Sequence, residues 1–159
     1  QGLVKTAEQR ALTDSELIAL ALFVRATTPT DSLYIAPPTA NVLQHLVRYP
    51  HYAPLIQLFL KRVEVIEPTR YVKRWARRLR DYGFTREDGA MLALGSFATN
   101  SEGSIIGMNY LATFDQPMIN QWDHQQDGIQ LRLQAMQRDL EPPYVHVTLP
   151  QVLRPDHVP

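Results

Sequence analysis

The positions of apolar and polar side chains along the chain predict helices alternating with short strands. Apolar residues recur three and four positions apart in seven stretches, the spacing of one helix face. Four shorter runs of β-branched, aromatic and other apolar residues indicate strands. The predicted helices cover residues 13–26, 38–47, 54–60, 69–82, 85–97, 116–122 and 129–140. The predicted strands cover residues 33–36, 63–66, 110–114 and 144–149, with a turn-rich loop at 27–31 and an irregular tail from residue 150.

Residues at the ends of these stretches support the predicted helix boundaries. Thr13 followed by Glu16 has the spacing of a capping box, in which the two side chains bond each other's backbone amides. Thr69 and Thr85 are predicted caps of the next helices, and Gly83 is a helix stop. Strands separated by helical stretches are typical of a mainly parallel sheet with helices on both faces, a three-layer α/β/α sandwich.

Composition places the chain among ordinary globular proteins. It has 159 residues, of which 45% are apolar and 20% charged, enough for one domain with its own core. No cysteine is present, which excludes disulfides, thiolate metal sites and cysteine nucleophiles. No apolar run approaches the roughly 20 residues of a membrane span, and no signal segment opens the chain. A cytoplasmic protein with no membrane partner is the expectation.

Positive charge is concentrated in one segment, although sixteen basic residues balance sixteen acidic ones overall. Residues 61–80 hold eight basic and two acidic side chains, a local net charge of +6. Five of these cations lie away from the Trp75 and Leu79 stripe of the predicted helix. They are Arg70, Lys73, Arg74, Arg77 and Arg78. The segment is either a solvated helix face or a face that contacts phosphates with salt-dependent affinity.

Ligands of α/β proteins bind beyond the carboxyl ends of strands, and two acidic residues can reach this edge of the predicted sheet. Asp115 directly follows the predicted strand 110–114, and Asp88 lies at the start of the helix 85–97. Each also has a structural interpretation, because an acidic residue is favoured as a helix cap or in the first helical turn. The sequence leaves both interpretations open.

Two segments in this order resemble the PIN-domain nucleases. GFTREDGAMLALGSFA, residues 83–98, is similar to the family's third acidic segment, and YLATFDQPMIN, residues 110–120, to its fourth. The segments SLYIAPPTANVLQHL, VEVIEP and YVHVTLPQVL resemble other strands of the family. The resemblance covers about residues 14–153. It implies a single PIN-like domain over residues 1–153, with residues 154–159 as a tail.

The resemblance also implies cleavage of RNA with Mg²⁺ or Mn²⁺ held by three or four carboxylates. Asp88 and Asp115 are the implied metal ligands, and Asn41 stands where the family has its second acidic residue. Asp14 resembles the first acidic residue but fits a helix start better, so the first strand is expected upstream of residue 1. Oxygen ligands suit such hard ions, which activate water and neutralise charge on the phosphate.

Three functions therefore follow as hypotheses. The first is a metal-dependent endoribonuclease that uses Asp88, Asp115 and Asn41, with RNA guided by the five cations. The second is a degenerate PIN-like domain that binds RNA or protein, an antitoxin-like partner included, without cleaving. The third is an unrelated α/β interaction domain in which both acids are helix caps. A homodimer is compatible with all three.

Overall fold

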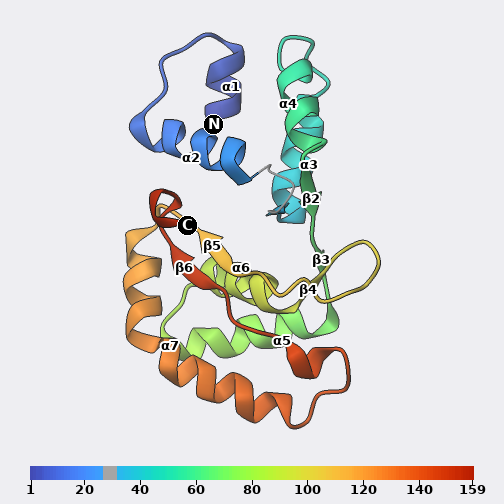
Figure 1. Ribbon diagram of the computed structural model, residues 1–159, viewed down its shortest axis with the longest axis vertical. Helices are drawn as coiled ribbons and strands as arrows, with labels where there is room; N and C mark the ends of the chain where they lie inside the picture. Colours follow the sequence, from blue (N-terminus) through green and yellow to red (C-terminus); the bar gives the residue numbers. More distant parts are fainter. Residues whose placement is uncertain (27–31) are drawn as a thin grey trace. The chain divides into compact units, whose positions relative to one another are not determined.

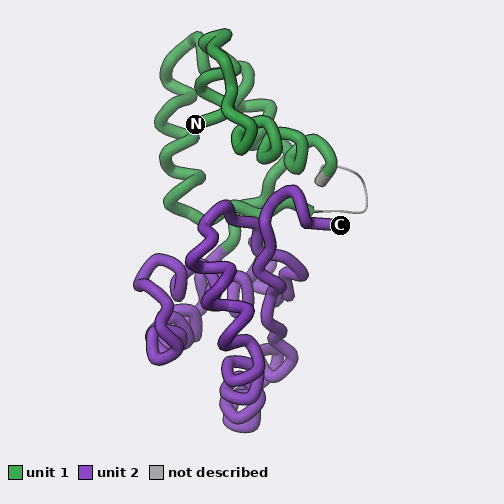
Figure 2. Tube along the Cα trace, turned by 90° about the vertical axis from the view of Figure 1, so that its left-hand side faces the viewer, with its two compact units in different colours: residues 1–66 green, residues 67–159 purple. Residues whose placement is uncertain are grey.

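The structure is a computed structural model that describes residues 1–26 and 32–159 (Figure 1). It is a mixed α/β protein in which helices predominate over short strands. The chain divides into two compact units, Gln1–Ile66 and Glu67–Pro159, coloured separately in Figure 2. The loop predicted at 27–31 lies outside the described residues. The prediction of one domain over residues 1–153 stays a prediction.

Unit 1 combines four helices with one parallel strand pair within its described residues. Its elements are α1 (Gly2–Ala7), α2 (Asp14–Ala26), β1 (Leu33–Ile35), α3 (Pro37–Leu46), α4 (Ala53–Leu60) and β2 (Val63–Val65). Strands β1 and β2 are parallel, with Leu33 opposite Val63. These bounds confirm the predicted elements to within one residue, whereas α1 was not predicted. The side chains of β1 are half-buried, although the pattern predicted a buried strand.

The capping box at the start of α2 is present as predicted. The Thr13 amide donates to Glu16 Oε2 at 2.9 Å, and the Glu16 amide donates to Thr13 Oγ1 at 3.4 Å. Lys5 Nζ of α1 lies 2.8 Å from the same Glu16 oxygen. Asp14 is therefore the first residue of a helix and does not follow a strand.

Unit 2 contains the larger core. Its elements are β3 (Glu67–Pro68), α5 (Arg70–Leu79), α6 (Arg86–Phe97), β4 (Ala98–Thr99), β5 (Tyr110–Ala112), α7 (Gln116–Gln137) and β6 (Gln151–Leu153), with short 3₁₀ turns at Arg80–Tyr82, Tyr144–His146 and Pro155–His157. The fully buried side chains of its core include Trp75, Leu79, Phe97, Ile129 and Leu133. The core therefore draws on α5, α6 and α7 together.

Strand pairing in the described residues is limited to three pairs. Besides β1–β2, strands β3 and β4 are antiparallel, and β5 and β6 are parallel and adjacent in Figure 1. The two parallel pairs agree with the predicted α/β class. Arrangement of these pairs in one layered sheet stays a prediction.

The predicted helices at 116–122 and 129–140 are wrong as two elements, because α7 runs without a break from Gln116 to Gln137. The polar residues between them are compatible with a helix, and Gly128 does not interrupt it. Gly128 instead permits a close approach. A Cβ atom there would lie 3.2 Å from Tyr82 Cε1, and the Tyr82 hydroxyl donates to the Gly128 carbonyl at 3.1 Å.

The strand predicted at 144–149 is also wrong. Tyr144–His146 form a 3₁₀ turn, and the Gln137 side-chain amide donates to the Val147 carbonyl at 2.7 Å in place of a neighbouring strand. The strand of this region is β6, which lies in the segment predicted to be irregular. Its pairing is extended by bonds from the Gln151 amide to the Asn109 carbonyl and from the Thr113 amide to the Leu153 carbonyl.

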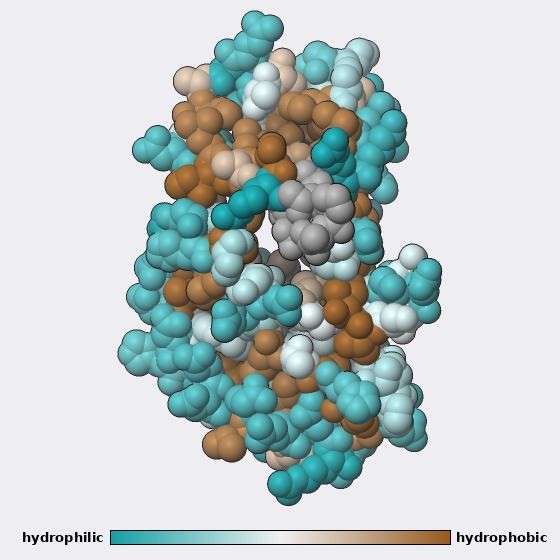
Figure 3. All heavy atoms as spheres, in the orientation of Figure 1, coloured by the Kyte–Doolittle hydropathy of each residue, from teal (hydrophilic) through white to brown (hydrophobic). Residues whose placement is uncertain are grey.

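Unit 1 leaves large apolar side chains at its surface. Leu17 is 52% exposed, Val42 60% and Leu58 52%. Figure 3 shows apolar atoms, in brown, at the surface of this unit in the upper part of the view. Despite this apolar character, within the described part of the chain no helix has both the length and the hydropathy to cross a bilayer.

Candidate nucleic-acid interface

Helix α5 has two chemically distinct sides. Val72, Trp75 and Leu79 are spaced three and four residues apart, and all three are buried in the core of unit 2. This spacing places them on one side of a helix with 3.6 residues per turn. Thr69 begins the helix, but its hydroxyl donates to the Phe97 carbonyl at 2.8 Å and does not cap an α5 amide.

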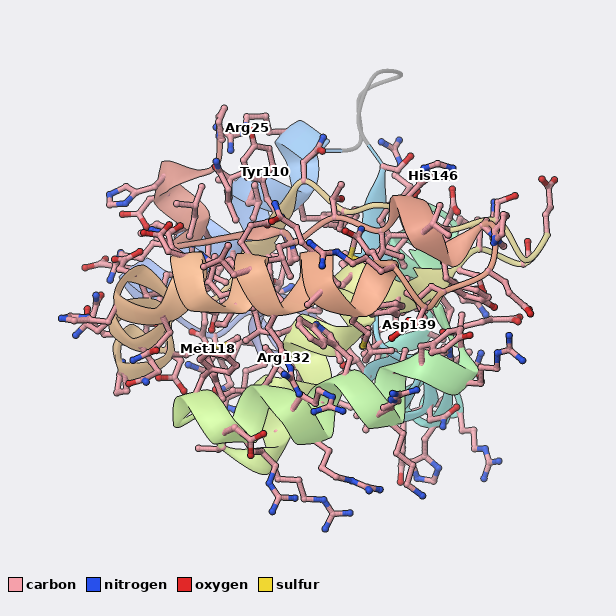
Figure 4. All side chains as sticks on the ribbon, turned by 90° about the horizontal axis from the view of Figure 1, so that it is seen from below. Arg25, Tyr110, Met118, Arg132, Asp139 and His146 are labelled. Atoms are coloured by element: carbon pink, nitrogen blue, oxygen red, sulfur yellow. The ribbon has the colours of Figure 1, made fainter. Side chains whose placement is uncertain are left out.

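The other side of α5 carries the five predicted cations, which we call the basic face. They are Arg70, Lys73, Arg74, Arg77 and Arg78. Four are exposed and Arg78 is half-buried. Figure 4 shows nitrogen-tipped side chains extending from α5 away from α7, and Arg132 of α7 pointing toward α5. The structure therefore brings the predicted cations together on one accessible surface.

Few of these charges are neutralised. Arg70 lies 3.6 Å from Glu141, and the two side chains are 65% and 83% exposed. Such an exposed pair contributes about 0–1 kcal/mol. For Lys73, Arg74, Arg77 and Arg78, the described residues provide no ion-pair partner. The positive potential of the basic face is therefore available to an anionic ligand.

An aromatic pair adjoins the basic face where α5 begins. The rings of Tyr71 and Tyr144 are 4.6 Å apart between centroids and inclined at 64°. The Arg70 Cζ atom lies 4.9 Å from the Tyr71 ring centroid and 5.9 Å from that of Tyr144. Sequence patterns did not identify this group, because Tyr144 was assigned to a strand and its contact with Tyr71 depends on the turn at Tyr144–His146.

Asp88 takes part in the cap of α6. The Asp88 amide donates to Thr85 Oγ1 at 3.1 Å, and the Thr85 hydroxyl donates to Asp88 Oδ2 at 2.6 Å. Such reciprocal bonding satisfies an amide that has no partner within the helix. The Asp88 carboxylate therefore has the helix-cap role that the sequence left open.

Asp115 is itself the N-cap residue of α7. It follows β5 as predicted, and its Oδ1 accepts a hydrogen bond from the Met118 amide of α7 at 3.1 Å. Its own amide donates to Thr113 Oγ1 at 3.1 Å. The position beyond a strand end is thus used here to start a helix.

The predicted metal ligands are distributed over the two units of the chain. Asn41 is an exposed residue of α3 and belongs to unit 1, whereas Asp88 and Asp115 belong to unit 2. Within residues 1–26 and 32–159, no three His, Asp or Glu side chains are grouped to hold a metal ion. Because both aspartates already take part in helix caps, we derive no metal-dependent step from this arrangement.

Comparison with known proteins adds no family to these observations. No protein-family model, curated protein or solved structure matches the chain.

Proposed function

We propose that the protein binds RNA through the basic face of α5 and does so without requiring cleavage. The observation that carries this proposal is the convergence of five cations on one exposed helix side, four of them without an ion-pair partner in the described residues. Arginine suits this role, since its planar guanidinium offers several donors to phosphate oxygens. Burial of Val72 and Trp75 on the opposite side keeps the basic face turned toward solvent.

Counterion release determines the expected behaviour of this interface. A protein that neutralises about four phosphates of a single strand should show a slope of log K against log salt near −3. Binding should therefore be strong at low salt and weaken steeply as salt rises. An interaction driven by apolar contacts would lack this dependence.

Fluorescence anisotropy with a short labelled RNA over a range of NaCl concentrations tests the proposal. Arg74→Gln and Arg77→Gln should each weaken binding and reduce the magnitude of the slope by about 0.7. Arg48→Gln, an exposed arginine of unit 1, is the matched control and should leave both quantities unchanged. Equal effects of all three variants, or no binding by the unaltered protein, would reject the proposal.

The metal-dependent endoribonuclease stays a second proposal, supported by the order of the acidic segments and their resemblance to PIN domains. Calorimetric titration with Mn²⁺ tests it, with Asp88→Asn and Asp115→Asn beside the unaltered protein. Asparagine caps a helix about as well as aspartate, so Asp115→Asn removes the charge and preserves the cap. Loss of Mn²⁺ binding in both variants would support one shared site. Absence of Mn²⁺ binding in the unaltered protein would reject the nuclease.

The resemblance supports two further proposals about architecture and partners. The proposed architecture is a three-layer α/β/α sandwich with a mainly parallel sheet, since parallel sheets are normally covered on both faces. A protein partner, an antitoxin-like one included, or a second copy of the chain would add to RNA binding. Sedimentation at several concentrations tests the homodimer, which predicts a mass that rises to twice that of one chain.

A further inference from the structure

We propose that Arg70, Tyr71 and Tyr144 form a stacking site for an unpaired nucleobase at the end of the basic face where α5 begins. This inference rests on the proposed RNA binding and specifies its substrate as single-stranded. The three side chains are called the stacking site below. They come from α5 and from the turn at Tyr144–His146, so the site joins segments far apart in the chain.

The two rings are held in place by the core. Tyr71 packs against Phe97, with ring centroids 5.9 Å apart, and Phe97 is fully buried. Tyr144 packs on Tyr71 from the side and also contacts the core cluster. Both rings remain half-exposed. A preorganised aromatic surface of this kind stacks a base with little loss of side-chain freedom.

Arg70 makes the stacking site suited to a nucleotide as a whole. Its guanidinium lies over the rings, where it provides a second planar surface for a base. The Tyr71 hydroxyl accepts from it at 3.1 Å, and the exposed pair with Glu141 is weak. Arg70 can therefore exchange Glu141 for a phosphate oxygen of the bound strand without a large loss.

The basic face continues from the stacking site along α5. Arg74 follows Arg70 by four residues and Arg78 follows Arg74 by four, which places their Cα atoms about 6 Å apart along the helix axis. A strand whose base is stacked on Tyr144 can thus continue along these cations. Positively charged grooves with adjoining aromatic rings are the usual design of single-strand binding. In a duplex, the base faces are covered by their neighbours and cannot enter the stacking site.

The first test needs no protein variant. Affinity of the unaltered protein is measured by anisotropy for a short single-stranded RNA and for an abasic strand of the same length and charge. Loss of one stacked base should weaken binding about tenfold. The duplex of the same sequence should bind no more tightly than the abasic strand. Equal affinities for the normal and abasic strands would overturn the inference.

Substitution of Tyr144 assigns the effect to this site. Tyr144→Leu keeps apolar packing but removes the ring, and should weaken binding of the normal strand about tenfold while leaving the abasic strand and the salt slope unchanged. Tyr144→Phe retains the ring and should bind as the unaltered protein does. An equal loss on both strands would show that the ring does not contact a base. Circular dichroism establishes that both variants are folded.

Glu141→Gln provides an independent measurement if Tyr144→Leu does not fold. Releasing Arg70 from its ion pair should strengthen binding about two- to fivefold for both strands, the range of an exposed pair. Unchanged or weaker binding would contradict the role of Arg70. RNA binding through the basic face has a separate test, and it is rejected if Arg74→Gln and Arg77→Gln leave RNA affinity unaltered. If those variants weaken binding but the abasic strand binds as tightly as the normal strand, only the stacking site is wrong.

Discussion

Asp88 and Asp115 illustrate how one sequence pattern is compatible with two structural roles of a carboxylate. An acidic residue after a strand or at a helix start is expected both in metal sites and in helix caps. The structure shows the second role for each, through bonds with Thr85 and with the Met118 amide. A local sequence pattern cannot separate the two roles, because the distinction depends on whether other carboxylates lie nearby in space.

Glu16 should make the stability of the protein depend on pH. The hydrogen bond from Lys5, together with the Thr13 amide, lowers the pKa of Glu16 from 4.5 to about 2. A carboxyl group with a depressed pKa in the folded state stabilises that state above its unfolded pKa. The contribution of Glu16 should therefore be complete above about pH 5 and decline as the pH falls from 4.5 toward 2.

Urea denaturation of Glu16→Gln and of the unaltered protein at several pH values measures this effect. Glutamine still accepts the Thr13 amide but cannot pair with Lys5 as an anion. The variant should be less stable at pH 7, and the difference should shrink toward pH 2. Asp14→Asn, at an exposed acid two positions earlier, serves as the control and should show a smaller change with pH. A difference for Glu16→Gln that did not vary with pH would refute the prediction.

At the scale of elements, close contact between α5 and α6 accounts for the glycine at position 89. Gly89 faces α5, and a Cβ atom there would lie 3.0 Å from the Ala76 carbonyl oxygen. A backbone atom cannot rotate away from such a contact. The close approach of the neighbouring helix therefore favours glycine here, although glycine is unfavourable in a helix by about 1 kcal/mol relative to alanine.

Gly89→Ala should therefore destabilise the protein despite its better helix propensity. Overpacking against a neighbouring backbone typically costs about 1–3 kcal/mol. Met91→Ala, at a position of the same helix that is 42% exposed, is the control and should change stability by no more than about 0.5 kcal/mol. Urea unfolding at pH 7 measures both. A more stable Gly89→Ala would show that α5 and α6 pack less closely than described.

At the scale of the whole molecule, the two units differ in their cores. Unit 2 buries large side chains, among them Trp75, Phe97 and Leu133. The buried apolar residues of unit 1 are fewer and mostly smaller. They include Ala36, Ala40, Ile56, Val63 and Ile66. Since burial of apolar surface drives folding at roughly 25 cal/mol per Å², unit 2 has the greater capacity to fold alone.

Separate expression of residues 67–159 and residues 1–66 tests this difference. The longer fragment should unfold in a single cooperative transition and bind RNA with the salt slope of the full chain, because it contains the basic face and the stacking site. The shorter fragment should show no cooperative transition. Circular dichroism during thermal unfolding records both results. If residues 67–159 did not fold and residues 1–66 unfolded cooperatively, unit 1 would be the unit that folds alone.

The sequence by itself determined the features that depend on neighbouring residues. Periodicity located most helices, and Thr13 with Glu16 predicted a capping box. Gly83 predicted a helix stop, and the structure has it in the left-handed conformation with φ of 86°. The division of α5 into an apolar and a basic side also followed from the sequence, because helix geometry converts spacing directly into direction.

Only the tertiary structure decided the features that depend on contacts between distant segments. The close contact between Gly128 of α7 and Tyr82 joins segments distant in the chain, and the location of β6 depends on its pairing with β5. The contact between Tyr71 and Tyr144 joins residues more than seventy positions apart. The physical reason is that capping and periodicity act over one or two helical turns, whereas strand pairing and ring contacts are selected by the packing of the whole core.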